Sequence, residues 1–191
     1  MIDNRRVFIP LVAAIVVLGV ILVGEVNHVP AQTLRVTSSS MRPTLAVGHV
    51  YPLETTAFRS ASPRIGEIVA FHAPEGAMPD TPVCGVPRPA GAVCPQPTPT
   101  RSNEIFVKRI VAGPGDTVSV LGGVVVRNGV AQHESYIAAC GASQECNFPT
   151  PVQIPRGEWF VMGDDRGASN DSRNWGPVPT AWIMGRIKVS P

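Results

Sequence analysis

The chain has 191 residues, which is enough for one membrane-spanning segment and one compact domain with a hydrophobic core of its own. Its formal net charge of only +2 at pH 7 gives no reason to expect nucleic acid or strongly acidic molecules as partners. Proline and glycine number 20 and 18, and this composition favours short strands and turns over a bundle of helices.

The N-terminal part of the chain contains an apolar stretch, residues 7–23. Its length is at the lower end of the ~17–25 residues that cross a bilayer as a helix. Arg5 and Arg6 precede this stretch, and Glu25 follows it. Because positive charge is usually retained on the cytoplasmic side, the pattern predicts a cytoplasmic N-terminus and export of the rest of the chain.

A cleaved secretory signal is the alternative, since residues 29–31 (Val-Pro-Ala) have the small residues of a cleavage site. The apolar stretch is longer than the ~7–15 residues typical of a signal peptide, and this favours an uncleaved anchor. The predicted organisation is a cytoplasmic segment (1–6), a transmembrane anchor (7–24) and an exported domain (25–191).

Most of the exported part has the alternation or the short apolar runs of β-strands. Asn128-Gly129, directly after such a run, predicts a two-residue hairpin turn, because both residues tolerate positive φ. The sequence therefore predicts a mainly β domain behind a single N-terminal transmembrane helix. The predicted strands are residues 66–72, 105–112, 117–127, 158–162 and 182–189.

A segment from about 73 to 104 is rich in proline and predicts a long surface loop or insertion. It contains Cys84 and Cys94, while Cys140 and Cys146 lie further along the chain. No C-x-x-C spacing indicates a zinc or redox site. Two local disulfides, one within each pair, are therefore favoured over free thiols, in agreement with export to an oxidising compartment.

Three consecutive serines, Ser38, Ser39 and Ser40, stand directly before the apolar Met41. A run of serines is most often a solvated linker. Here Pro43 fixes the backbone just after the serines. A hydroxyl held in a rigid turn beside an apolar wall is suited to nucleophilic catalysis.

Lys108 lies in a predicted strand otherwise rich in Phe, Val and Ile. It is either an outward-facing lysine or one whose ammonium group is desolvated, so that its pKa is lowered. Lowering this pKa from ~10.4 to about 8 takes roughly 3 kcal/mol of unfavourable burial, and such a lysine can act as a general base. The neighbouring Arg109 is expected on the opposite face of the strand.

A third polar segment, residues 163–173, follows the strand predicted at 158–162. It is either a solvated loop or a set of hydroxyls and paired charges that hold a catalytic group. Asp171 and Arg173 are the candidate charge pair.

Together these segments resemble the type I signal peptidases, the serine–lysine peptidases that release exported proteins from their leader sequences. Four motifs carry the resemblance, and they follow the N-terminal apolar stretch in the order found in that family. They are Ser-x-Ser-Met-x-Pro-Thr-Leu at 38–45, Gly-Glu-Ile-Val-Ala-Phe at 66–71, Val-Lys-Arg-Ile-Val-Ala-Gly-Pro-Gly-Asp at 107–116 and Met-Gly-Asp-Asp-Arg…Ser-Asn-Asp-Ser-Arg at 162–173.

The resemblance implies that Ser40 is the nucleophile and Lys108 the general base. It implies that the Ser38 hydroxyl and the Ser40 N–H are the oxyanion donors. It also supports the Cys140–Cys146 pairing, which some members of the family have. The other implied roles are a lysine-orienting hydroxyl at Ser169, a supporting ion pair of Asp171 with Arg173, and a wall of the substrate site at Met41.

Three residues depart from the family pattern. Ser39 stands where glycine is common, Asp165 where asparagine is common, and Gly167 where aspartate is common. A carboxylate close to Lys108 favours the protonated amine, so Asp165 is expected to raise the lysine pKa if it lies nearby.

The function implied by the resemblance is removal of N-terminal signal peptides from exported preproteins. The partners are these preproteins and the lipid bilayer, without nucleic acid, cofactor or metal. The implied location is the bacterial inner (plasma) membrane, as a single-pass protein with a periplasmic or other extracytoplasmic catalytic domain.

Three alternatives remain. One is a specialised relative that matures a single substrate, such as a conjugative pilin. Another is a self-cleaving Ser–Lys repressor, which an apolar N-terminal segment disfavours because such repressors need a DNA-binding module. The third is a non-enzymatic, membrane-tethered β domain that binds extended peptides.

Overall fold

The structure is a computed structural model, and it describes residues 32–78, 82–141 and 146–189. The predicted cytoplasmic segment and anchor, residues 1–24, lie outside this part of the chain. Within the described residues no helix has the length and apolar character to cross a membrane.

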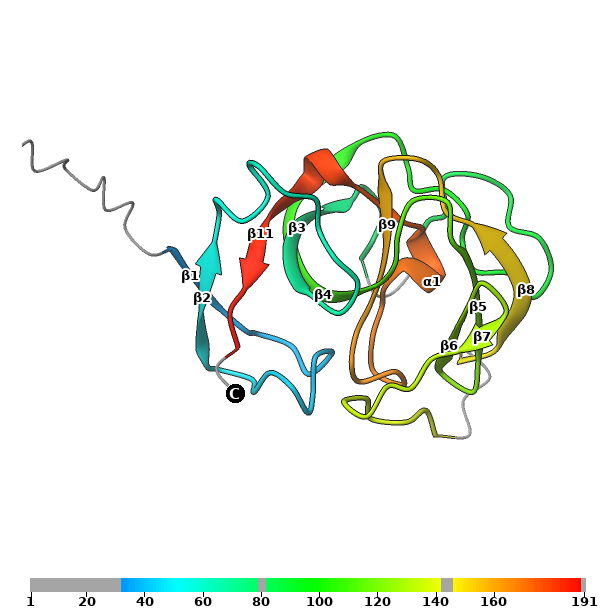
Figure 1. Cartoon of the computed structure of the whole chain (residues 1–191), viewed down its shortest axis with the longest axis horizontal. Coiled ribbons are helices and arrows are strands. Elements are labelled where there is room, and N and C mark those ends of the chain that lie inside the picture. The colour runs from blue at the N-terminus through cyan, green and yellow to red at the C-terminus, as the bar shows by residue number, and fades with distance from the viewer. Residues whose placement is uncertain (1–31, 79–81, 142–145, 190–191) are drawn as a thin grey trace, which may run out of the picture.

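The described chain is mainly β, as predicted, and its strands form two sheets (Figure 1). The larger sheet has the order β1-β2-β11-β3-β4-β9-β10, and the smaller has the order β7-β6-β5-β8. The strands are β1 (Gln32–Arg35), β2 (Val50–Glu54), β3 (Ile68–Pro74), β4 (Arg101–Ala112), β5 (Thr117–Leu121), β6 (Val124–Arg127), β7 (Val130–Ala131), β8 (Phe148–Gln153), β9 (Glu158–Met162), β10 (Val178–Pro179) and β11 (Ile183–Ile187). The helices described are the short α1 (Ser172–Trp175) and the 3-10 turn η2 (Thr180–Trp182).

The predicted strands are confirmed as β3, β4, β9 and β11, whereas the one predicted at 117–127 is two strands, β5 and β6. Gly122 and Gly123, both with positive φ, form the turn between them. The Asn128-Gly129 turn is confirmed, with φ of 52° and 79°, and it joins β6 to β7. β1, β2 and β8 were not predicted, because they are largely exposed and lack a clear alternation.

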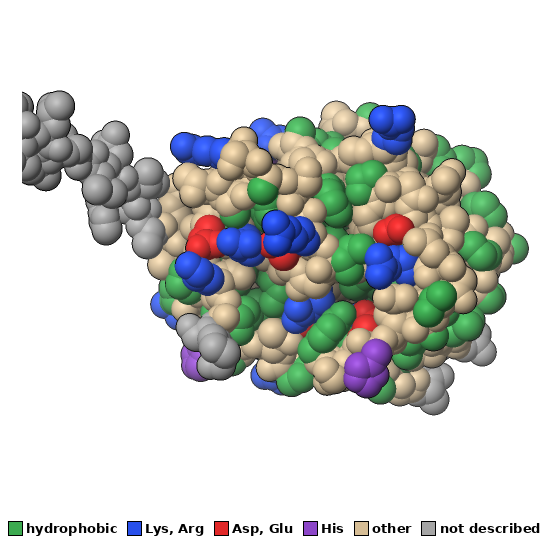
Figure 2. Space-filling model, viewed as in Figure 1, with side chains coloured by type: hydrophobic (Ala, Val, Ile, Leu, Met, Phe, Trp, Pro, Cys, Tyr) green, Lys and Arg blue, Asp and Glu red, His purple; other side chains and the backbone are tan. Residues whose placement is uncertain are grey.

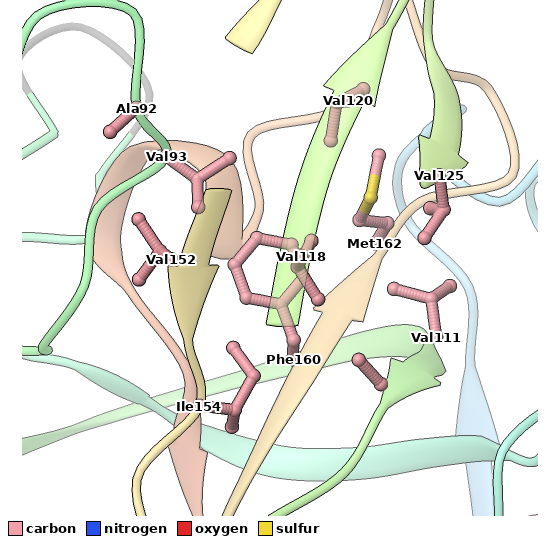
Figure 3. Packing of buried hydrophobic residues seen from close by; sticks show 11 residues of the cluster. Ala92, Val93, Val111, Val118, Val120, Val125, Val152, Ile154, Phe160 and Met162 are labelled. Carbon is pink, nitrogen blue, oxygen red and sulfur yellow. The ribbon is translucent and has the colours of Figure 1, made fainter. Parts of the chain in front are cut away.

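Buried side chains of the smaller sheet and of β9 form one hydrophobic core. Figure 3 shows Val118 and Val120 of β5 beside Phe160 and Met162 of β9. Val93, from the proline-rich segment, points into the same cluster and is fully buried. This core fixes the position of β9 and therefore of the polar loop that follows it.

The prediction of a surface loop or insertion at about residues 73–104 is therefore right only in part. Val93 and Cys94 are completely buried, and the Cys94 N–H donates to the carbonyl of Arg173 at 2.9 Å. The Cys84–Cys94 disulfide lies in this segment. The predicted Cys140–Cys146 disulfide is also present. The segment therefore packs against the loop that carries the candidate ion pair.

Charged side chains lie against one another on the face shown in Figure 2. Arg186 of β11 pairs with Glu54 of β2 at 2.7 Å and with Glu67, next to β3, at 2.6 Å. These contacts link neighbouring strands of the larger sheet. Because the pairs are solvent-exposed in part, each contributes about 0–1 kcal/mol to stability.

Candidate active site

Ser40 lies in a turn between β1 and β2 that the core holds in place. Met41 and Leu45 are 1% and 0% exposed, and the Leu45 N–H donates to the Met41 carbonyl at 2.8 Å. The Ser40 carbonyl accepts a hydrogen bond of 3.0 Å from the Asp165 N–H. The serine run is therefore not a solvated linker: the turn is fastened to the core and to the loop after β9.

Lys108 lies on β4, opposite Val69 of β3, and its side chain is buried rather than outward-facing. Its Nζ donates a hydrogen bond of 2.6 Å to the Ser40 Oγ. The two residues are 68 positions apart in sequence, and the fold brings their reactive atoms into contact. Arg109 points away from this contact, as strand alternation predicts, and binds Asp164.

Burial of the ammonium group lowers the pKa of Lys108 to about 8. The carboxylates of Asp171 and Asp164 oppose this change and the charge of Arg173 adds to it, but desolvation is the largest cause. A substantial fraction of neutral amine is therefore present slightly above neutral pH.

Hydrogen-bond donors stand next to the Ser40 hydroxyl. The Ser38 Oγ lies 3.2 Å from the Ser40 Oγ. Among the described residues, the Ser40 backbone N–H has no acceptor. One hydroxyl and one free N–H are thus close to the position where a negative charge develops when Ser40 attacks a carbonyl.

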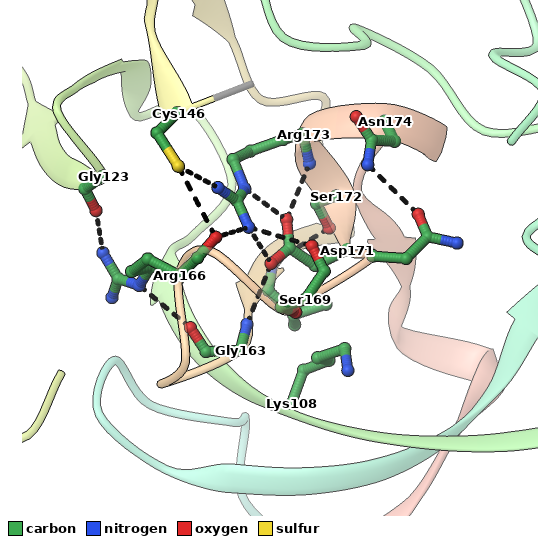
Figure 4. Close-up of polar contacts among 12 residues, drawn as sticks. Lys108, Gly123, Cys146, Gly163, Arg166, Ser169, Asp171, Ser172, Arg173 and Asn174 are labelled. Carbon is green, nitrogen blue, oxygen red and sulfur yellow. Dashed lines mark hydrogen bonds and ion pairs between the residues drawn. The ribbon is translucent and has the colours of Figure 1, made fainter. Parts of the chain in front are cut away.

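Asp171 and Arg173 form the predicted ion pair at 2.8 Å, with side chains 0% and 3% exposed. Asp171 also caps α1 and accepts the Gly163 N–H, while Arg173 donates to the Ser169 carbonyl (Figure 4). Burial acts to raise the pKa of Asp171, but Arg173 and the Gly163 N–H outweigh it and hold this pKa below its ordinary value. The pair fixes the polar loop beside Lys108.

Ser169 has a buried Oγ that makes no hydrogen bond within the described part of the chain. The contact between this hydroxyl and Lys108 that the resemblance implies is therefore not formed in this arrangement. A Cβ added at Gly163 would lie 2.2 Å from the Ser169 Oγ and 2.4 Å from the Ser40 carbonyl. Only glycine fits there, and its absent side chain lets Ser169 and the nucleophile turn approach each other.

Asp165 is not the carboxylate that acts on Lys108. Its Oδ1 accepts the Ala168 N–H at 3.2 Å, and it is not among the charges that shift the lysine pKa. Asp164 and Asp171 are the carboxylates that raise that pKa. The carboxylates that favour protonated Lys108 therefore both belong to the shared motif at 162–173, and the departure at Asp165 does not add to them.

Sequence reasoning missed a second buried network. Asp164 is fully buried, accepts two hydrogen bonds from Arg109, at 2.9 and 2.7 Å, and accepts the Thr44 hydroxyl at 2.5 Å. The Arg109 guanidinium lies 4.0 Å from the centre of the Tyr136 ring. These contacts tie the nucleophile turn, β4 and the loop after β9 together. The only available signal was the occurrence of all three polar residues inside the shared motifs.

A cleft of about 320 Å³ opens above Ser40 and Lys108. Residues 34–38 form one side, residues 104–107 of β4 form the other, and Met41 contributes to the wall as predicted. Among the described residues, β4 pairs with β9 only from Arg109 onward, and none of them pairs with its edge over residues 101–108 on the side away from β3. β1 is the outermost strand of the same sheet. Two strand edges that pair with no strand in the described part of the chain thus flank the cleft.

The Ser40 hydroxyl is hydrogen-bonded to a buried lysine at the base of a cleft between strand edges. This is the arrangement that serine–lysine acyl-transfer chemistry requires. Comparison with known proteins agrees with this class. Residues 8–190 match the family described as "Signal peptidase, peptidase S26". The chain belongs to this family.

Individual proteins similar to this chain are also named as signal peptidases. "Probable signal peptidase I-1" of Synechocystis is 34% identical over 180 residues, which cover 93% of this chain and 77% of the relative. "Signal peptidase I" of Leptolyngbya laminosa is 33% identical over 172 residues, covering 90% and 74%. The crystal structure of a signal peptidase I from Enterococcus faecalis is 24% identical in sequence and has a TM-score of 0.45. The match covers 67% of this chain and 98% of the Enterococcus chain.

Proposed function

We propose that this chain is a membrane-bound serine endopeptidase that removes N-terminal signal peptides from exported preproteins. Ser40 is the nucleophile and Lys108 the general base. The observation that carries the proposal is the 2.6 Å contact between Lys108 Nζ and Ser40 Oγ, made by a buried lysine with a pKa of about 8. The names of the relatives supply the substrate class.

Acylation begins when neutral Lys108 takes the proton of Ser40 as the hydroxyl attacks the scissile carbonyl. The Ser40 N–H and the Ser38 hydroxyl stabilise the oxyanion. Protonated Lys108 then gives its proton to the leaving amine. In deacylation, neutral Lys108 activates a water molecule that releases the peptide from Ser40.

We assign orientation of Lys108 to the Ser169 hydroxyl. Buried hydroxyls nearly always have a partner, and this one has none among the described residues. On this assignment, the Ser169 side chain rotates and its hydroxyl accepts a hydrogen bond from Lys108 Nζ when the hydrogen bond between Lys108 and Ser40 is broken. The Asp171–Arg173 pair holds the segment that carries Ser169.

The substrate binds in extended form between the open edges of β1 and β4, where backbone hydrogen bonds supply affinity. Met41 and the residues beside it contact the side chains close to the cut. Residues 1–6 are cytoplasmic, 7–24 anchor the chain, and 25–191 form the catalytic domain outside the inner (plasma) membrane. The lipid bilayer is the second partner.

Incubation of the purified full chain, in detergent, with a test preprotein is the direct experiment. The expected product is the mature protein, identified by its N-terminal sequence, with a serine-reactive probe attached to Ser40. A chain that binds the preprotein but neither cleaves it nor reacts with the probe is a peptide-binding domain, and the proposal is then wrong. Cleavage of a single dedicated substrate would instead indicate the specialised relative.

The rate of cleavage is expected to rise with pH. Because burial lowers the pKa of Lys108 to about 8 and only the neutral amine accepts a proton, kcat/KM should increase about tenfold per pH unit below pH 8 and level off above it. A rate profile from pH 6 to 10 measures this. Asp165→Asn is the matched control and should leave the midpoint unchanged; a profile that falls with pH would contradict the assignment of Lys108.

Ser38→Ala should lower kcat by about 10²–10³-fold with a small effect on KM, because one of two oxyanion donors is lost. Steady-state kinetics on the same preprotein measure the effect. Ser39→Ala is the control, since the described structure records no hydrogen bond of its hydroxyl. Equal rates for the Ser38 and Ser39 variants would contradict the assignment of the Ser38 hydroxyl as an oxyanion donor.

A further inference from the structure

A second hollow, of about 410 Å³, lies beside the cleft. The first turn of the proline-rich segment, residues 73–78, forms one side of it, and residues 102–104 of β4 form the other. Met78, Glu104 and Phe106 line both hollows. The two therefore adjoin each other along the open edge of β4.

Met78 stands where the two hollows meet, and this residue is 56% exposed. The residue before it, Ala77, is only 2% exposed and packs in the core beneath β3. The Ala77 N–H donates to the Pro74 carbonyl at 3.1 Å, which closes a turn. The backbone directly before Met78 is thus held in a turn, and Met78 itself is exposed to solvent.

Asn170 connects this turn to the candidate catalytic loop. Its Nδ2 donates to the Ala77 carbonyl at 2.7 Å, and its Oδ1 accepts a bond of 3.2 Å from Asn174 of α1. Asn170 stands between Ser169 and Asp171 and also lines the first hollow. The segment beside Ser40 and Lys108 therefore holds the backbone of the residue that precedes Met78.

We propose that Met78 is a specificity-determining residue that contacts an apolar side chain of the bound preprotein, and that Asn170 positions it. This inference rests on the proposed function. A peptide that continues from Lys108 to the level of Glu104 covers four residues of strand, about 13 Å. The contacted side chain is therefore about four residues from the scissile bond. An unbranched thioether side chain adapts to aliphatic partners of different shape.

The test uses the full chain in detergent and preproteins that differ at one position, with leucine or serine at each site within six residues of the cut. Wild type should cleave the leucine form about tenfold faster, in kcat/KM, at one position about four residues away. Met78→Ser should abolish this preference at that position alone, and Met78→Leu should retain it. Val130→Ser is the control, since this exposed valine lines neither hollow.

Asn170→Ala should reduce the same preference, measured as the ratio of kcat/KM for the leucine and serine forms, in which any loss common to both substrates cancels. The double variant with Met78→Ser should show no further loss of preference, because both changes act on one contact. A leucine preference that Met78→Ser leaves intact at every position overturns the inference about Met78. An equal loss on all substrates in Asn170→Ala overturns its positioning role. Failure of wild type to cleave any preprotein would instead refute the proposed function.

Discussion

Ser40→Ala and Lys108→Ala should each reduce preprotein cleavage by at least about 10⁴-fold in kcat. Removing either member of a nucleophile–base pair costs nearly as much as removing both, since each is ineffective without the other. The 2.6 Å contact between the two side chains is the physical basis of this expectation. The double variant should therefore be hardly less active than either single one.

Cleavage is measured by the appearance of mature protein, and folding by circular dichroism and thermal unfolding. Ser39→Ala and Lys188→Ala are matched controls, because Ser39 adjoins the nucleophile and Lys188 is an exposed lysine paired with Glu54. Both controls should process the preprotein at nearly the wild-type rate. Substantial processing by a folded Ser40 or Lys108 variant would refute the dyad.

Asp171→Ala should destabilise the domain by about 3–5 kcal/mol, because it removes the carboxylate from a buried guanidinium. Asp171 accepts Arg173 Nε at 2.8 Å and the Gly163 N–H at 3.0 Å, and neither Asp171 nor Arg173 is appreciably exposed. Urea unfolding at pH 7 measures the loss. Lys188→Ala, which breaks an exposed pair with Glu54, should cost no more than about 1 kcal/mol.

The same interaction should depend on pH in a defined direction. The pKa of Asp171 is lower in the folded chain than its ordinary value, so its stabilisation is fully present at neutral pH. It should be lost only in acid, as the pH falls through the ordinary carboxyl range toward the folded-state pKa. If Asp171→Ala were as stable as wild type at pH 7, the ion pair would not support the polar loop.

Local features of the fold could be predicted from sequence because they depend on neighbouring residues. The Asn128-Gly129 turn needs two consecutive positive φ angles, and few other residue pairs adopt them. β3, β4 and β9 were predicted from alternating or apolar runs, which also involve only residues close together in sequence. The two disulfides join cysteines only 10 and 6 positions apart, so local pairing was the natural expectation.

Long-range features could not be predicted in this way. The order of the larger sheet places β11 between β2 and β3, and no local pattern encodes that neighbour. Val93 shows the limit clearly: its proline-rich surroundings predict a surface loop, yet its side chain fills the core beside β5 and β9. The pair of Arg109 with the fully buried Asp164 was missed because partners 55 positions apart meet only through strand pairing.

The sequence alone predicted Ser40 and Lys108 as nucleophile and general base, through the resemblance of their motifs to those of the type I signal peptidases. The tertiary structure decided whether these residues touch, because contact across 68 positions depends on how the nucleophile turn packs against β4. It also decided the state of the lysine, since desolvation at the buried base of the cleft, not residue type, brings the pKa of Lys108 to about 8. Burial is a property of the whole fold, and it turns an ordinary lysine into a candidate base.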